Sequence, residues 1–410
     1  MAFYDSEDKE DKVHGGIFHC LNDTGKVIDP HMRHIVSSTR WVVQYAWALL
    51  RFPGEAPHFR ARLNSCMRFL RSHHLQSNGG YRWALNVGGG DEVALVAASH
   101  GSPDNIRAYG MAFAVLAYAT ALRAGLEEAR VSLASVSADF TAHFWEEEEG
   151  LYADEATGDW GTTLPYRGSN ANMHSLEAHM AAWVASREPF HLQRARKIAH
   201  SLCVRQAERV GAVLGEALTY EHYTQQWEPD FEASLDMKKD RFKPWGFQVG
   251  HLMELAKLLL QLNAHTENET PQARAWRLPT AERFFAAALR GWDEKHGGLA
   301  YSLAPTPGTP VCDNDKYKWV QAEAIAAAAL LAVAVEKSPS PSAQTPQFYW
   351  GWYDRLWGYC WGHFIDHRCG AWFRMLNPDN SKHDDYKCPP GKVDYHSCGA
   401  CYDVIDCLEA

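Results

Sequence analysis

The chain has 410 residues, of which 46% are hydrophobic and 22% are charged, a balance typical of a globular protein with a sizeable core. Its formal net charge of −10 provides no basic surface, which argues against binding to nucleic acid or to an anionic membrane. A neutral small-molecule substrate fits this composition better.

The first residues, MAFYDSEDKEDK, are charged where a signal peptide would need an apolar stretch. No apolar run reaches the length of a membrane span, and the longest, from Ala324 to Val335, is expected to be a buried helix. The ten cysteines are scattered, with six of them after position 359. This pattern predicts reduced thiols in a cytoplasmic protein.

Helical periodicity dominates the chain, and no comparable series of strand patterns accompanies it. The predicted helices lie at about 31–52, 56–73, 104–125, 128–143, 170–187, 190–206, 245–263, 271–290, 316–336, 344–363 and 396–407. A twelfth helix would belong before residue 15, so the first helix is expected to be incomplete. The Pro- and Ser-rich stretch 337–346 is interpreted as a loop. The long segment 207–241 is interpreted as a functional loop at a cavity rim.

A short turn of glycine followed by apolar residues recurs between pairs of predicted helices. The turns are centred on Gly16, Gly80, Gly150, Gly215, Gly298 and Gly370, at successive steps of 64, 70, 65, 83 and 72 residues. Each interval is long enough for a helical hairpin and its connections. Six such hairpins predict an all-α fold, an (α/α)6 barrel formed as a double ring of helices, with residues 1–410 as a single domain.

Polar groups concentrate where the predicted inner helices begin. In two of these helices the i, i+3 spacing places a histidine and a carboxylate on one face, as His174 with Glu177 and His251 with Glu254. A single pair of this kind is usually a surface or capping contact. Two pairs in corresponding repeats, together with His396, favour a functional site instead.

Five motifs in a fixed order carry a family resemblance. They are Ser38-Thr39-Arg40, the run Asn170-Ala171-Asn172-Met173-His174-Ser175-Leu176-Glu177-Ala178, the run Pro244-Trp245-Gly246-Phe247-Gln248-Val249-Gly250-His251 with Glu254, the run Trp319-Val320-Gln321-Ala322-Glu323-Ala324, and Tyr395-His396. From about residue 15 to the C-terminus the chain resembles the N-acylglucosamine 2-epimerase superfamily. Within it, the motifs are most similar to the mannose isomerase branch, which includes the sulfoquinovose isomerase type.

The resemblance implies an (α/α)6 barrel, a monosaccharide substrate and no obligatory cofactor. It places nine residues in the sugar pocket: Arg40, Tyr109, Asn170, His174, Arg241, His251, Glu254, Trp319 and His396. One departure is Leu255, where such isomerases often have Trp. That difference weakens the assignment to the mannose isomerase branch more than it weakens the assignment of the fold.

Aldose–ketose interconversion takes the proton from C2, passes through an enediolate and returns a proton to C1. Histidine, with an ordinary pKa of about 6.5, suits this transfer near neutral pH. We expect His251 and His396 to be the catalytic pair, and the sequence leaves open which one acts as the base.

The other residues that the resemblance places in the pocket are expected to bind or polarise the sugar. Arg40, Arg241 and His174 would polarise the carbonyl and stabilise the developing oxyanion. Glu254 would orient His251. Trp319 and Tyr109 would pack on the sugar ring.

The sequence is also compatible with three other functions. The same pocket could reprotonate C2 from its opposite face, which would make a 2-epimerase. An (α/α)6 glycoside hydrolase would need two opposed carboxylates, for which Glu177, Glu254 and Glu323 are available. A non-catalytic sugar-binding protein would use the 16 tryptophans but not the histidine pair.

Neither a metal ion nor a macromolecular partner other than a second copy of the chain is expected. His251 with Glu254, and Cys398 with Cys401, have ligand-like spacing but no second pair at zinc spacing, so no metal is predicted. No nucleic-acid or membrane partner is predicted either, and the protein is expected to be a monomer or a homodimer.

Overall fold

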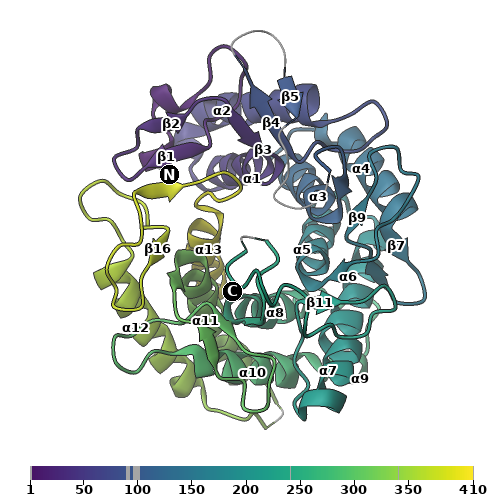
Figure 1. The fold of residues 1–410 in the computed structure, drawn as a ribbon, viewed down its shortest axis with the longest axis vertical. Helices are drawn as coiled ribbons and strands as arrows, with labels where there is room; N and C mark the ends of the chain where they lie inside the picture. Colours follow the sequence, from purple (N-terminus) through teal and green to yellow (C-terminus); the bar gives the residue numbers. More distant parts are fainter. Residues whose placement is uncertain (1, 89–92, 96–101, 241, 340, 410) are drawn as a thin grey trace. The chain divides into compact units, whose positions relative to one another are not determined.

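The computed structural model describes residues 2–88, 93–95, 102–240, 242–339 and 341–409, and it is mainly helical (Figure 1). The chain divides into two compact units, which are described separately. Unit 1 comprises Met1–Ile198 and Tyr386–Tyr395, and unit 2 comprises Ala199–Asp385 and His396–Ala410.

In unit 1, three core helices are buried on nearly all sides, and each is followed in the chain by a covering helix. The core helices are α1 (Ile35–Arg51), α3 (Ala108–Arg123) and α5 (Ser169–Ser186), and the covering helices are α2 (Ala56–Phe69), α4 (Ala129–Phe144) and α6 (Pro189–His200). Helix α3 packs against both α1 and α5. Its many alanines favour helix and allow this close packing.

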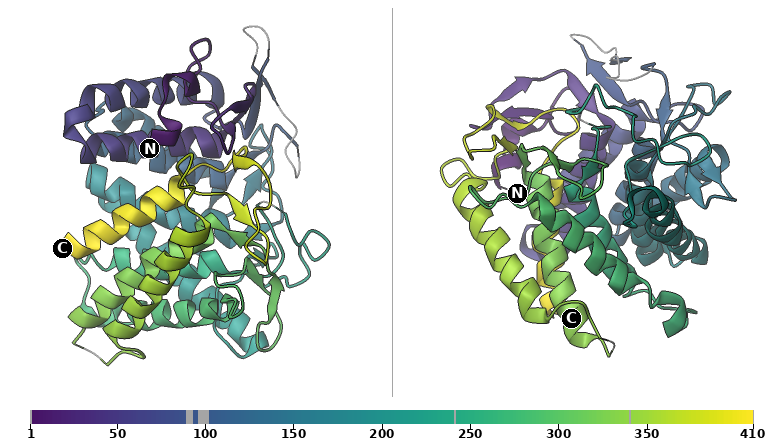
Figure 2. Two further views of the ribbon diagram at one scale, coloured as in Figure 1. Left: turned by 90° about the vertical axis from the view of Figure 1, so that its left-hand side faces the viewer. Right: turned by 60° about the horizontal axis from the view of Figure 1, so that its bottom comes forward.

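Unit 2 also contains three core helices. Its core helices are α8 (Val249–Leu262), α11 (Lys318–Lys337) and most of α13 (Tyr395–Glu409), and its other helices are α7 (Ala207–Leu214), α9 (Pro271–Arg274), α10 (Arg277–Ala288) and α12 (Pro346–His363). Helix α8 contacts α10 and α11, and α11 lies beside α12 (Figure 2).

One described helix, α11, is long and apolar enough to cross a membrane by length and composition. Of its apolar window, 72% is buried within the protein, as is common for a core helix. The buried helix expected around Ala324–Val335 is therefore confirmed.

All eleven predicted segments contain helix, with two corrections to the pattern. Residues 207–214, predicted as the start of a long loop, continue as helix α7, because Ala207 and Val210 supply a buried apolar face. Before Gly15, the described residues form two three-residue 3-10 turns, Ala2–Tyr4 and Glu7–Lys9, and no α-helix. The charged run there offers no apolar face around which a longer helix could pack.

Short strands that the sequence did not reveal precede five of the core helices, and four of these strands pair within their own unit. These four are β3 (Met32–His34), β6 (Ile106–Arg107), β12 (Phe247–Gln248) and β15 (Lys316–Tyr317). Their antiparallel partners are β4 (Ala84–Val87), β9 (Glu155–Ala156), β13 (Ser302–Leu303) and β16 (Met375–Leu376). The remaining strands are β1 (Cys20–Asn22), β2 (Val27–Asp29), β5 (Val93–Leu95), β7 (Trp145–Glu146), β8 (Leu151–Tyr152), β10 (Arg167–Gly168), β11 (His222–Tyr223), β14 (Val311–Asp313) and β17 (Tyr386–Cys388). Two or three residues are too few to show alternating hydrophobicity.

The recurring glycine turns form tight hairpins, most of them at the ends of covering helices. In unit 2, Gly297 and Gly298 have φ angles of 76° and 82°, which an L side chain rarely adopts. The hairpin is tied to α11 by Gln321, whose side-chain amide accepts from the Leu299 N–H at 2.9 Å and donates to the Leu299 carbonyl at 2.8 Å. In unit 1, Asn172 of α5 makes the same two hydrogen bonds with Tyr152.

Candidate functional site

A cluster of two histidines, one tryptophan and two carboxylates lies in unit 2 where its core helices begin. We call His251, His396, Trp319, Glu221 and Glu323 the histidine cluster. All five side chains are buried. They come from the segment before β11 and from the first two turns of α8, α11 and α13.

His251 is held by a carboxylate that is distant in the sequence. Its Nδ1 lies 2.8 Å from Oε2 of Glu221, which is 30 positions earlier. The other carboxylate oxygen of Glu221 accepts from the backbone N–H of Gln248 at 3.4 Å. The hydrogen bond that orients the ring thus comes from Glu221, and the choice of Glu254 for that role is corrected. The i, i+3 spacing could not reveal this partner, because the contact is tertiary.

His396 is held in the same way. Its Nδ1 lies 2.7 Å from Oε1 of Glu323 on α11. An ionised carboxylate can only accept a hydrogen bond, so Nδ1 of each imidazole is the donor. Each neutral ring then carries its lone pair on Nε2, which is the atom available to take or deliver a proton.

Trp319 lies next to both imidazoles. The ring centroids of Trp319 and His251 are 5.2 Å apart, and those of Trp319 and His396 are 5.5 Å apart. The indole packs directly on the backbone of α8, where a Cβ added to Gly250 would lie 2.2 Å from a ring carbon. Gly250 is therefore required for Trp319 to lie beside the histidines.

A third carboxylate and a lysine adjoin the histidine cluster. Ligand atoms of Glu254, Glu323 and His396 lie within 4.8 Å of one another, a grouping with the residue types and spacing to hold a metal ion. The ammonium group of Lys257, however, already lies 2.7 Å from Oε2 of Glu323. A cation is thus supplied to this carboxylate by the chain itself.

In unit 1, Arg40 is the centre of a second group, which we call the arginine cluster: Arg40, Tyr109, Phe113, His174 and Tyr395. The guanidinium carbon lies 4.6 Å from the ring centroid of Phe113 and 4.7 Å from that of Tyr395. One guanidinium nitrogen donates to the Tyr109 hydroxyl at 3.3 Å. Contact with two aromatic faces fixes the plane of the charged group.

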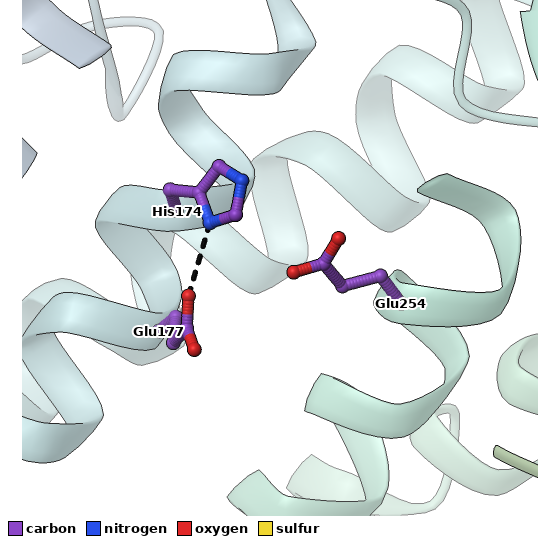
Figure 3. Close-up of side chains that lie close together, drawn as sticks. All are labelled: His174, Glu177 and Glu254. Atoms are coloured by element: carbon purple, nitrogen blue, oxygen red, sulfur yellow. Dashed lines mark hydrogen bonds and ion pairs between the residues drawn. The ribbon is translucent and has the colours of Figure 1, made fainter. Parts of the chain in front are cut away.

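His174 and Glu177 form the pair that their spacing predicted. Nδ1 of His174 lies 3.0 Å from Oε2 of Glu177, one turn further along α5 (Figure 3). The hydroxyl of Tyr395 donates to the other carboxylate oxygen. The His174 ring also lies against Tyr109 and Phe113, with centroids 5.1 and 4.6 Å apart.

The remaining predicted residues have different outcomes. Asn170 is the second residue of α5, and its buried side-chain oxygen makes no hydrogen bond with any described residue. Arg241 lies outside the described residues. Of the residues that sequence reasoning missed, Glu221 belongs to the 207–241 segment expected at a cavity rim, and Lys257 follows Glu254 by one helical turn.

Comparison with known proteins identifies relatives along nearly the whole chain. Residues 16–400 match the model of the N-acylglucosamine 2-epimerase (GlcNAc 2-epimerase) family. A D-mannose isomerase from Marinomonas mediterranea is 42% identical over 395 residues, which cover 96% of this chain and 92% of that protein. The family resemblance inferred from the motifs is thereby confirmed.

Two solved structures are similar to the model. A D-mannose isomerase crystal structure is 40% identical, with a TM-score of 0.87, and the match covers 99% of this chain and 95% of the other. The cellobiose 2-epimerase of Spirochaeta thermophila is 19% identical, with a TM-score of 0.79 over 98% and 92% of the two chains, which indicates a shared fold.

Proposed function

Because this chain belongs to the N-acylglucosamine 2-epimerase family, we propose that it is an aldose–ketose isomerase that interconverts D-mannose and D-fructose. Similarity to D-mannose isomerases over nearly its full length supports the reaction and the monosaccharide substrate. The observation that carries the mechanism is the pair of imidazoles beside Trp319, each held at Nδ1 by a buried carboxylate.

His251 and His396 perform the proton transfers of this mechanism. Nε2 of one imidazole takes the proton from C2, which gives an enediolate, and the other imidazole moves a proton from the oxygen at C2 to the oxygen at C1. A proton is then delivered to C1, and C2 becomes the ketone carbon. Protons are conserved across these steps, and the histidine that takes one is restored when the proton returns.

The family resemblance assigns further residues to substrate binding. In unit 1, Arg40 and His174 stabilise the negative charge on the sugar oxygens, and Tyr109 and Asn170 contact the sugar. Arg241 is assigned the same electrostatic role as Arg40. In unit 2, Glu254 binds substrate hydroxyls and Trp319 packs on the ring.

A hydrolase is the less suitable alternative for these carboxylates. Glycoside hydrolysis needs one carboxyl group as an acid and another as a base or nucleophile. Glu323 is instead engaged by His396 and Lys257, and Glu177 by His174 and Tyr395.

We further propose that the helical hairpins and α13 close into an (α/α)6 barrel and form one domain over residues 1–410. The repeat of helical hairpins and the similarity in fold to solved family members support this architecture. The cytoplasmic location and the monomeric or dimeric state remain predictions.

Incubation of the purified protein with D-mannose tests the proposed reaction. Chromatography of the products is expected to show fructose that accumulates to an equilibrium mixture. Glucose in place of fructose would identify a 2-epimerase, and no change in the sugar would contradict both reactions.

A further inference from the structure

Lys257 is a buried charge in unit 2 that the proposed mechanism does not use. It lies on α8, one turn after Glu254, and is only 5% exposed. Lysine is almost never buried this deeply unless its charge is paired. Its ammonium group lies 2.7 Å from Oε2 of Glu323 on α11 and 3.4 Å from Oδ2 of Asp403 on α13.

The charged groups around Lys257 come from three helices. Glu254 is on α8, Glu323 is on α11, and His396 and Asp403 are on α13. Asp403 is fixed in turn by Gln261, whose side-chain nitrogen donates to Oδ1 at 2.9 Å. Lys257 is the cation that the described contacts place among these carboxylates.

The two oxygens of Glu323 are divided between a histidine and this lysine. Oε1 accepts from Nδ1 of His396 at 2.7 Å, and Oε2 faces the ammonium group. A buried carboxylate keeps its charge only when such partners compensate for the lost hydration. The lysine thus stabilises the negative charge of Glu323 and holds the orientation of its carboxylate.

We propose that Lys257 is a positioning residue, whose ammonium group fixes the Glu323 carboxylate and, through it, the His396 ring. This inference rests on the proposed function, because it gives His396 a part in proton transfer. Removal of the positive charge lets the coupled Glu323 and His396 pair hold its shared proton more tightly. The pair then titrates at a higher pH, whichever of the two groups carries the proton.

Lys257→Met tests the proposal, since methionine keeps the length of the side chain without its charge. We expect kcat to fall at least ~10-fold with little change in KM, because the proton transfer step is affected more than sugar binding. The limb of the pH–rate profile that reports the histidine is expected to move to higher pH by about one unit, which is a tenfold change in proton affinity.

Two further variants separate this role from a structural one. Lys316→Met removes another fully buried lysine of unit 2, which contacts Asp293, Asn380 and the Pro378 carbonyl. It is expected to lower the melting temperature without moving the pH profile. Lys257→Arg keeps the charge, so its pH profile should stay near that of the unchanged protein. A shift in Lys257→Arg as large as that in Lys257→Met would overturn the proposal.

An NMR titration of the ligand-free protein tests the same coupling without turnover. The His396 resonance is assigned by its loss in His396→Ala, and it is expected to titrate at higher pH in Lys257→Met. If Lys257→Met changed neither the titration of His396 nor the pH dependence of turnover, the proposed role of Lys257 would be wrong. Failure of the unchanged protein to convert mannose would instead reject the proposed function, and the titration would still decide the coupling.

Discussion

The two imidazoles assigned to proton transfer share one arrangement, in which a buried carboxylate binds Nδ1 and Nε2 is left to react. Glu221 has this position at His251, and Glu323 has it at His396. The carboxylate selects the tautomer and stabilises the imidazolium that forms during the reaction. This arrangement leaves Nε2 of each ring as the atom that can take or return a proton.

We predict that His251→Ala and His396→Ala each lower kcat by ~100-fold or more, which is the usual scale for removal of a general acid or base. Each variant should stay folded, with a loss of about 1–3 kcal/mol in the free energy of unfolding, because a buried carboxylate loses one hydrogen bond. The exposed His367 provides the control, since His367→Ala should keep full activity. Near-normal turnover in either of the first two variants would remove that residue from the mechanism.

Gly250 provides a second prediction at this scale. Gly250→Ala places a methyl group 2.2 Å from the position of a Trp319 ring carbon, so the indole must move away from the histidines. We expect at least a ~10-fold loss of kcat and a loss of about 1–3 kcal/mol in the free energy of unfolding.

A helical glycine with open space around it provides the matched control. A Cβ added at Gly351 of α12 would meet nothing within 4 Å. Gly351→Ala should therefore stabilise the protein by up to about 1 kcal/mol through helix propensity. Equal stabilisation by both substitutions, measured by denaturant unfolding, would show that Trp319 does not depend on Gly250.

Sequence reasoning selected the two histidines to which we assign proton transfer, but not the residues that hold them. His174 and Glu177 could be paired because they are one turn apart on a single helix. Glu221 and Lys257 could not, because their partners lie on other elements and the contacts arise only on folding.

At the scale of elements, short strands set where the core helices begin. A strand pair precedes most core helices, so polar or aromatic side chains occur at the same position, counted from the first residue, in each of these helices. The sixth residues of α1, α3, α5, α8 and α11 are Arg40, Phe113, His174, Glu254 and Glu323. Helix periodicity predicted the eleven helical segments. The strands were too short to predict. The common register that they give the helices was therefore not predicted either.

Buried neutral histidines join elements of unit 1. His74 accepts from the Ser38 hydroxyl at Nε2, at 2.9 Å, and donates from Nδ1 to the Arg82 carbonyl, also at 2.9 Å. Burial lowers the pKa of His74 to about 3 and that of His191 to about 4. Burial also lowers the pKa of His19 and His179. These side chains remain neutral in the folded protein at neutral pH.

We predict that the protein loses stability as the pH falls from about 7 to 4. An unfolded histidine binds a proton near pH 6.5, whereas His74 stays neutral in the folded state until about pH 3. The unfolded state therefore binds more protons in this window, and acid favours it. Calorimetric melting across the window would check the direction.

His74→Gln should reduce this dependence, because glutamine does not titrate. The exposed His200 provides the control, and His200→Gln should leave the slope unchanged. A melting temperature that stays constant or rises towards pH 4 would contradict the neutral state of the buried histidines.

For the molecule as a whole, the proposed mechanism requires no metal ion in the chemical step. Arg40 supplies positive charge in unit 1, and Lys257 supplies it to Glu323 in unit 2. We predict that turnover survives exhaustive treatment with EDTA. Loss of activity that one divalent ion restores would assign Glu254, Glu323 and His396 to a metal site instead.

In the proposed reaction, this protein isomerises mannose by proton transfer through an enediol. The most direct measurement is NMR analysis of the sugar formed from D-mannose in D2O. We predict fructose with deuterium at C1, because the histidine that returns the proton exchanges with solvent. We also predict almost no product with His396→Ala. Fructose with only protium at C1 would indicate a hydride shift, and either that result or full activity of His396→Ala would contradict the proposed mechanism.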